Sequence, residues 1–247
     1  MEVLRLEDIS KQIGGLRILN EISLSLQEGE RWGIIGPNGS GKTTLLNVIS
    51  GVMRPSSGKV YLFGKEVSGR PVHAFVHLGL ARTFQLNTLF LRMTVLDNTL
   101  FALKGTKRYR FRMLRSLDSY DALFTEAKEV LLQWGLWEKR ELAVKSLSYG
   151  DQRCLELILG LVSNPRVVLL DEPTAGLSAQ EIAIFKRVIE AIQSKHTVVI
   201  VEHNLDVIFE LAQSFIVLDH GEIIAKGDKD SIKADPRVRK VYLGPVT

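Results

Sequence analysis

One stretch of the sequence, IIGPNGSGKTTLL, combines glycines with a lysine and a threonine at the spacing of a phosphate-binding loop. Gly36, Gly39 and Gly41 let the backbone curl so that several amide N–H groups point at one anion. In such loops the ammonium, here Lys42, reaches the β- and γ-phosphates of a nucleotide, and the hydroxyl, here Thr43, binds Mg²⁺. Glycine-rich turns are also common between ordinary strands and helices. The complete pattern, set between the strand-like RWGII and the helix-like TTLLNVIS, favours a polyphosphate site.

A second stretch, RVVLLDEP, places two acids at the end of an apolar run that predicts a buried strand. Asp171, at the carboxyl edge of a sheet, suits Mg²⁺ held through water. Glu172 is the candidate general base that polarises the attacking water, a role that contributes about 10²- to 10⁴-fold in rate. An acidic strand end alone is a weak signal. Paired with the phosphate loop, it predicts an ATPase or a GTPase, and the sequence holds no Asn-Lys-x-Asp motif for guanine.

A third stretch, LSYGDQ, precedes the apolar helical run CLELILGLV. Ser148 and Gly150 open this helix, and the start of a helix attracts anions through its free N–H groups and its dipole. The chain therefore carries two predicted phosphate-binding helix starts, far apart in the sequence.

The elements that must position these residues follow from the hydrophobic pattern. VLRLEDIS, RILNEISLSL and RWGII predict strands of a partly antiparallel sheet, and GKVYLFGKEV predicts a further strand. RVVLLD, TVVIVE and FIVLD alternate with helices that start at Ser178 and Asn204, which is typical of a parallel sheet with crossover helices. The expected fold class is α/β: a P-loop NTPase core with a mostly parallel sheet, an N-terminal antiparallel β part and an inserted helical lobe.

The inserted lobe is predicted where the pattern changes from strands to helices. Thr94 and Asp97 have the spacing of a helix N-cap, and one face of a later helix carries apolar residues. We expect residues 1–85 and 148–247 to form an ATP-binding core, with residues 86–147 as the lobe. The apolar face consists of Leu123, Ala127, Val130, Leu131 and Trp134.

The composition narrows the class of protein. The chain has 247 residues, 45% of them hydrophobic, which indicates a packed globular protein. The net charge of +4 is too small to indicate a nucleic-acid partner. Cys154 is the single cysteine and cannot form an internal disulfide, which fits a reducing compartment. MEVLRLEDIS does not resemble a secretory signal, and no apolar run approaches the roughly 18 residues of a membrane span. We therefore expect a cytoplasmic protein, and any role at a membrane would depend on a partner protein.

Taken together, these motifs resemble those of the ATP-binding subunit of ABC transporters, over essentially the whole chain. LSYGDQ is similar to the signature loop of that family, GPNGSGKTT to its phosphate loop, RTFQ to its glutamine loop and VEHN to its switch histidine. The resemblance implies that the chain binds ATP and Mg²⁺. It assigns Gln85 to the metal site beside Thr43 and Asp171, and it assigns His203 to the γ-phosphate and the attacking water, with Glu172.

The resemblance also implies a head-to-tail dimer, formed with an identical chain or with a homologous ATPase. Each ATP would lie between the phosphate loop of one subunit and the signature loop of the other, so that ATP joins the subunits and hydrolysis releases them. The implied nucleotide contacts are Ile13, Gly36, Asn38, Gly39, Ser40, Gly41, Lys42, Thr43, Thr44, Ser148, Gly150 and Gln152.

Two positions depart from the family pattern. Ile13, in KQIGG, stands where an aromatic residue usually stacks on adenine, and an aliphatic contact forfeits about 0.5–1.5 kcal/mol if aromatic-pair values transfer. The preference for ATP over other triphosphates is thereby left open. Ser178 stands where an Asp is common, and its spacing to Glu181 predicts a capping box at a helix start.

Several strings are most similar to the ATPases of branched-chain amino-acid importers: GLARTFQ, MTVLDN, LSYGDQRCLE and EHNLDVIF. This implies a subunit that energises import through integral-membrane permease subunits and that lies peripherally on the inner face of the cell membrane. Importers of urea or short amides are near relatives of this group, so the resemblance leaves these solutes open as alternatives. LNTLFLRM is either lobe core or a groove for a short helix of a membrane subunit. The basic stretch Lys104 to Arg115 is a solvated face, a contact for anionic lipid headgroups or, third, one for nucleic acid.

Three other functions compete with import. ABC-type ATPases that act on nucleic acid or ribosomes generally carry a coiled-coil insertion or two cassettes, and this chain has one phosphate loop, one signature and no sustained heptads. No nucleic-acid partner is therefore expected. ATPases of lipopolysaccharide export share the C-terminal ending but not the RTFQ string. A catalytically silent scaffold is disfavoured because Lys42, Asp171, Glu172 and His203 are all present.

Overall fold

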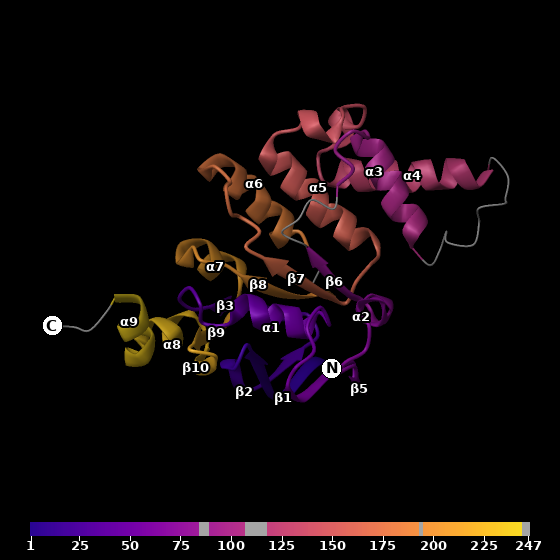
Figure 1. The fold of residues 1–247 in the computed structure, drawn as a ribbon. Helices are drawn as coiled ribbons and strands as arrows, with labels where there is room; N and C mark the ends of the chain where they lie inside the picture. Colours follow the sequence, from indigo (N-terminus) through magenta and orange to yellow (C-terminus); the bar gives the residue numbers. More distant parts are fainter. Residues whose placement is uncertain (84–88, 107–117, 193–194, 244–247) are drawn as a thin grey trace. The chain divides into compact units, whose positions relative to one another are not determined.

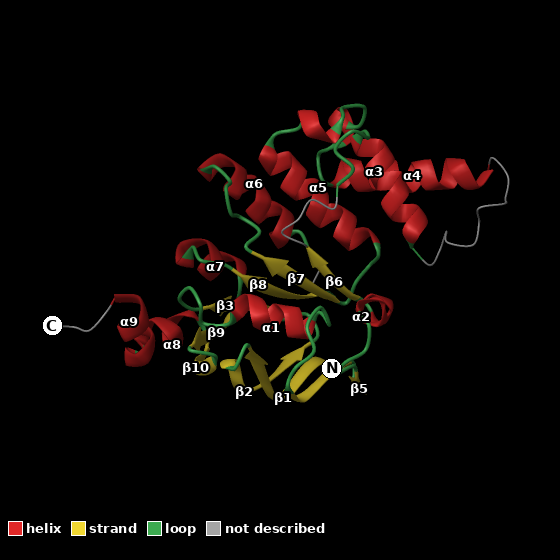
Figure 2. Ribbon diagram, viewed as in Figure 1, coloured by secondary structure: helices red, strands yellow, loops and turns green. Residues whose placement is uncertain are grey.

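The computed structural model describes residues 1–83, 89–106, 118–192 and 195–243 (Figure 1). The chain divides into two compact units. The core unit contains Met1–Arg82, Arg166–Pro173 and Ile192–Thr247, and the helical unit contains Thr83–Pro165 and Thr174–Ala191. Figure 2 shows that the strands gather in the core unit, whereas helices make up most of the helical unit.

The first sheet of the core unit is antiparallel, with the order β2-β1-β4-β5. The turn between the first two strands uses Gly14 and Gly15, both with positive φ. The stretch GKVYLFGKEV was expected to form one strand, but it forms two because Phe63 and Gly64 adopt left-handed backbone conformations that turn the chain. The strands are β1 (Glu2–Ile13), β2 (Leu16–Gln27), β4 (Ser57–Leu62) and β5 (Lys65–Glu66).

The second sheet is mostly parallel, with the order β10-β9-β3-β8-β7-β6. β3, β7, β8 and β9 run parallel, whereas β10 pairs antiparallel to β9. RWGII forms β3 and belongs to this sheet. It was expected in the partly antiparallel sheet with the first two strands, but its apolar side chains are buried on both faces, as is typical of a parallel strand. The expected α/β class is confirmed. The strands are β3 (Arg31–Ile35), β6 (Leu80–Thr83), β7 (Val167–Asp171), β8 (Thr197–Val201), β9 (Ser214–Asp219) and β10 (Glu222–Gly227).

Helix α1 (Lys42–Ile49) lies between the two sheets of the core unit (Figure 1). Its residues Leu45, Leu46, Val48 and Ile49 are buried in one hydrophobic cluster with side chains from both sheets. The helix that follows the phosphate loop is therefore held from two sides. The other helices of this unit are α2 (Val72–Leu78), α7 (Leu205–Leu211), α8 (Lys229–Ala234) and α9 (Pro236–Leu243).

The helical unit contains α3 (Val95–Gly105), α4 (Asp118–Gln133), α5 (Tyr149–Val162) and α6 (Ala179–Glu190). It therefore includes α5 and α6 in addition to the segment 86–147. The predicted N-cap at Thr94 and the predicted capping box Ser178–Glu181 are both confirmed, and Thr94 also forms a capping box with Asp97. On the predicted apolar face of α4, Leu123, Ala127 and Leu131 are buried, whereas Val130 and Trp134 are half-buried. Among the described residues, no helix is long and apolar enough to cross a membrane.

The position of α1 between two sheets predicts that a buried valine on this helix contributes more to stability than an exposed valine on α2. Val48 on α1 is 1% exposed, and Val76 on α2 is 54% exposed. Replacing Val48 with Ala removes two buried methyl groups and leaves a cavity, which should lower the free energy of unfolding by about 2 kcal/mol. Val76→Ala should change it by less than about 0.5 kcal/mol. Urea unfolding followed by circular dichroism measures both, and equal losses would contradict this account of the core.

Candidate functional site

The parallel pairing of three strands assembles the candidate site within the core unit. β8 pairs with β3 on one side and with β7 on the other, and Asp171 lies opposite Val201 in the register. The residues that follow these strands therefore leave the sheet at the same edge. The phosphate loop follows β3, Glu172 follows β7, and His203 follows β8 by one intervening residue.

A cavity of about 400 Å³ lies at this edge of the sheet. Residues from the phosphate loop and the first turn of α1 form one side, and Glu172, His203 and Ile18 complete the lining. This volume is within the range of small-molecule sites. Of the predicted nucleotide contacts, the cavity lining includes Asn38, Gly39, Gly41, Lys42, Thr43 and Thr44.

The glycines of the loop are required by close backbone neighbours. A Cβ at Gly36 would lie 2.2 Å from the carbonyl oxygen of Leu218, and a Cβ at Gly41 would lie 2.9 Å from the carbonyl oxygen of Ile18. Gly41, the N-cap of α1, also has a φ of 103°, which L side chains rarely adopt. The loop therefore packs directly on the backbone of β2 and β9, and this contact fixes the direction of its N–H groups.

Lys42 is nearly buried and is folded back on its own loop. Its Nζ donates to the carbonyl oxygens of Gly36 at 2.8 Å and Pro37 at 2.9 Å. Burial lowers the pKa of Lys42, and the carboxylates of Glu172 and Asp171 oppose this effect. The ammonium thus stands at the cavity wall, with two carbonyl acceptors that an anionic ligand can replace.

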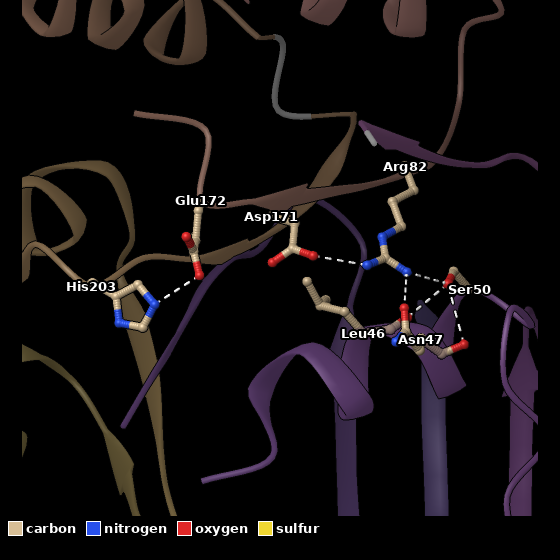
Figure 3. A network of polar contacts seen from close by, with 7 residues as sticks. All are labelled: Leu46, Asn47, Ser50, Arg82, Asp171, Glu172 and His203. Atoms are coloured by element: carbon tan, nitrogen blue, oxygen red, sulfur yellow. Dashed lines mark hydrogen bonds and ion pairs between the residues drawn. The ribbon is translucent and has the colours of Figure 1, made fainter. Parts of the chain in front are cut away.

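Glu172 and His203 both line the cavity, and their side chains contact each other (Figure 3). Oε1 of Glu172 lies 2.7 Å from Nε2 of His203, and a carboxylate acceptor requires the proton to be on Nε2. Glu172 has a φ of 46°, a left-handed conformation that is uncommon for a residue other than glycine. Its N–H donates to the carbonyl oxygen of Val201 at 2.9 Å, which ties this strained residue to β8. Strained backbone of this kind is concentrated at functional sites.

Asp171 is bound by an arginine through one of its two carboxylate oxygens (Figure 3). Nη2 of Arg82 donates to Oδ2 of Asp171 at 2.8 Å, and the two side chains are 8% and 1% exposed. Oδ1 of Asp171 has no hydrogen-bond partner among the described residues. Oγ of Ser40, in the phosphate loop, is also buried and lacks a partner in the described part of the chain. These two oxygens are available to a ligand.

The signature residues lie in the helical unit at the start of α5. Ser148 is the N-cap, and its Oγ accepts from the N–H of Asp151 at 3.1 Å. The N–H of Gly150 donates to Oε1 of Glu181 at 2.9 Å. Hydrogen bonds from the backbone of Ser178 and then of Gly150 lower the pKa of Glu181, so this helix start already holds a carboxylate.

Two predicted residues that could be located, Ile13 and Gln152, are not part of the cavity lining. Gln85 lies outside the described residues, as do residues 107–115 of the basic stretch. Ile13 is exposed at the end of β1 and is not part of the cavity lining, whereas Ile18, five residues later, is. Gln152 is on α5 in the helical unit, where its Nε2 donates to the carbonyl oxygen of Leu147 at 3.2 Å.

Sequence reasoning did not assign roles to Arg82 or Ile18. The available signal for Arg82 was a charged residue in the short apolar stretch LART, which forms β6. Ile18 gave no signal, because alternate apolar residues are normal in a strand such as β2.

Comparison with known proteins agrees with this geometry. Residues 19–175 match the family model described as ABC transporter. The chain is 33% identical to the high-affinity branched-chain amino acid transport ATP-binding protein BraF of Pseudomonas aeruginosa, over 98% of both chains. It is similar to the crystal structure of MJ1267, an ATP-binding cassette of an ABC transporter, in the ADP conformation (TM-score 0.84, 31% identity, 99% and 100% of the two chains).

A second solved structure captures a dimer. It is the dimeric post-hydrolysis state of the ATP-binding cassette MJ0796 bound to ADP and Pi, with a TM-score of 0.75 and 25% identity over 91% of this chain and 98% of that one. The family match spans more than half of the chain, and the relatives match it over nearly its full length. The chain therefore belongs to the ABC transporter family.

Proposed function

We propose that this ATPase energises the import of branched-chain amino acids, or of related small polar solutes, through membrane permease subunits. The observation that carries the proposal is the single cavity that brings the phosphate loop together with Glu172 and His203. The similarity to BraF supports the solute class, because that protein is named for branched-chain amino acid transport. The protein works as a peripheral subunit on the inner face of the cell membrane.

The residues at the cavity fit a magnesium ion bound with ATP. Mg²⁺ prefers oxygen ligands: the cavity lining offers the hydroxyl of Thr43, and Asp171, next to the lining residue Glu172 in the chain, has an Oδ1 without a hydrogen-bond partner among the described residues. Gln85 is proposed as a further ligand from the family resemblance. The ion, when bound, neutralises charge on the β- and γ-phosphates during transfer.

Hydrolysis uses the described side chains in three roles. Lys42 exchanges its two loop carbonyls for phosphate oxygens, which the positive end of α1 and the loop N–H groups also bind. Glu172 accepts a proton from water as the water oxygen bonds to the γ-phosphorus and the bond to the β–γ bridging oxygen breaks. His203 holds the Glu172 carboxylate through its Nε2–H, and this N–H turns to the γ-phosphate when ATP is bound. The products are ADP and inorganic phosphate.

Two subunits complete each nucleotide site in this proposal. Ser148 and Gly150 of one chain contact the γ-phosphate bound at the phosphate loop of the other, with Gln152 close by. The dimer of MJ0796 supports a paired arrangement. The partner is an identical chain or a homologous ATPase. Because Glu181 now occupies the N–H of Gly150, the γ-phosphate must take this donor from the carboxylate.

The helical unit offers a surface for the permease. Phe90 and Phe101 are 47% and 57% exposed, and their rings meet edge to face at 4.9 Å. The buried side chain of Asn98 holds this arrangement, since its Oδ1 accepts from the N–H of Phe90 and its Nδ2 donates to the carbonyl oxygens of Phe90 and Thr94. An exposed aromatic pair on a fixed backbone suits the apolar face of a short helix.

The relatives favour import over the other two activities considered, which are action on nucleic acid or ribosomes and lipopolysaccharide export. Membrane binding separates import from action on nucleic acid, because an importer ATPase binds its permease whereas a nucleic-acid ATPase binds DNA or RNA.

The base role of Glu172 predicts a specific defect. Glu172→Gln keeps the shape and the contact with His203 but cannot accept the proton, so phosphate release should fall by about 10²- to 10⁴-fold while ATP remains bound. Glu66→Gln, on an exposed strand end, should leave turnover unchanged. Phosphate release and nucleotide binding are measured on the same samples. Normal turnover of Glu172→Gln would remove Glu172 from this role.

Lys42 should contribute to nucleotide affinity. Replacing it with Ala removes charge-assisted hydrogen bonds worth roughly 1.5–3 kcal/mol, so ATP should bind about 10- to 100-fold more weakly. The control is Lys59→Ala, whose side chain is 55% exposed beside Glu66. Titration with a fluorescent ATP analogue measures both variants. Equal affinity of Lys42→Ala and the wild type would contradict the phosphate-loop assignment.

Permease binding tests the transport proposal. Salt-washed membranes that contain the cognate permease should bind the wild-type protein, and Phe101→Glu should weaken binding about 30-fold, the loss expected for an interface hot spot. Leu132→Glu, at a similarly exposed apolar position on α4, is the matched control. Basal ATP hydrolysis should be the same in all three proteins. Binding that follows added DNA instead of the permease would overturn the proposal.

A further inference from the structure

Arg82 makes a buried connection between three elements of the core unit (Figure 3). Arg82 lies on β6. Its Nη1 donates to Oδ1 of Asn47 at 2.7 Å and to Oγ of Ser50 at 2.9 Å. Its Nη2 donates to Oδ2 of Asp171 at 2.8 Å. Asn47 belongs to α1 and Ser50 is the C-cap of that helix. One guanidinium thus joins the helix after the phosphate loop to the strand that carries the acid.

The two oxygens of Asp171 have different environments. Oδ2 is bound by Arg82, whereas Oδ1 has no hydrogen-bond partner among the described residues. Figure 3 shows that Oδ1 points to the side on which Glu172 and His203 lie. The carboxylate of Asp171 is 1% exposed, and its ion pair with Arg82 compensates part of the cost of burying a charge.

We propose that Arg82 is a positioning residue for magnesium: it holds Asp171 by one oxygen and thereby keeps the other oxygen directed at the metal. The inference rests on the proposed nucleotide site. Arg82 does not touch the metal or the nucleotide in this arrangement. Because it binds a different oxygen from the one offered to the metal, it remains in place when MgATP binds.

The rotation of the carboxylate is the quantity that Arg82 controls. The fork geometry of guanidinium fixes the acceptor in direction as well as in distance, and Asn47 and Ser50 fix the fork itself. Without Arg82, the buried carboxylate of Asp171 would turn toward other donors, and this rotation removes an oxygen from the metal site. Charge alone predicts the opposite effect, since a nearby cation repels a metal ion, and the experiment distinguishes the two.

The test uses Mn²⁺ in place of Mg²⁺ and a fluorescent, non-hydrolysable ATP analogue. Nucleotide affinity is measured in saturating Mn²⁺ and again in EDTA, and the ratio of the two affinities reports the contribution of the metal. Arg82→Met should lower this ratio by about 10- to 100-fold, as loss of a group that orients a metal ligand does, with the affinity in EDTA nearly unchanged. The electron paramagnetic resonance spectrum of bound Mn²⁺ should change as well.

Two further variants make the outcome specific. Arg82→Lys keeps the charge and one donor and should recover part of the ratio. Arg166→Met removes a different arginine–carboxylate pair, the exposed contact with Glu28 at 2.8 Å, and should leave the ratio at the wild-type value. A ratio for Arg82→Met that equals or exceeds the wild-type value would overturn the proposal.

A folding defect in Arg82→Met does not prevent the test. Ser50→Ala removes one of the acceptors that orient the guanidinium and leaves every charge in place, so it should lower the ratio in the same direction by a smaller factor. Wild-type ratios from both Ser50→Ala and Arg82→Lys would then overturn the role of Arg82. A wild-type protein whose nucleotide affinity does not respond to Mn²⁺ would instead contradict the proposed magnesium site.

Discussion

The parallel pairing of β8 between β3 and β7 brings three segments that are distant in sequence to one edge of a sheet. Each strand is buried on both faces, so its register is fixed by packing as well as by hydrogen bonds. A slip of one residue in β7 would turn the side chain of Asp171 to the opposite face of the sheet, and the acid would leave the site. The chemistry at this edge therefore depends on the apolar residues of the strands as much as on the polar residues that follow them.

Besides the strand register, the site depends on a balance between the positive and negative side chains that lie close together. Lys42 and Arg82 bring two cations, and Asp171 and Glu172 bring two anions, to one part of the core unit, where the side chains of Arg82 and Asp171 are buried. In the structure, Lys42 binds carbonyl oxygens of its own loop and Arg82 binds Asp171. The proposed MgATP complex replaces the first of these contacts and retains the second. The loop ammonium is thus the group that exchanges partners, and the arginine is the group that stays.

Much of this arrangement could be predicted from the sequence because it depends on local signals. The glycine loop, the capping boxes and the buried runs of β7 and β8 each follow from residues within a few positions of one another. Arg82 could not be assigned in this way, since its three acceptors lie 32, 35 and 89 residues away in the chain. The cavity position of Ile18 and the pairing of RWGII with β8 and β9 likewise depend on tertiary packing, which periodicity does not report.

The N–H groups at the start of α5 have one anionic partner in a single chain and would have a different one in the proposed pair of chains. These N–H groups attract an anion, and in the structure Glu181 provides one from the same unit. In the proposed dimer, a γ-phosphate on the second subunit carries more charge than a carboxylate and offers three oxygens, so it competes well for the N–H of Gly150. On the same proposal, hydrolysis and loss of that phosphate return the donor to Glu181. The carboxylate would then satisfy the helix start between cycles and lower the cost of separating the two proposed subunits after each hydrolysis.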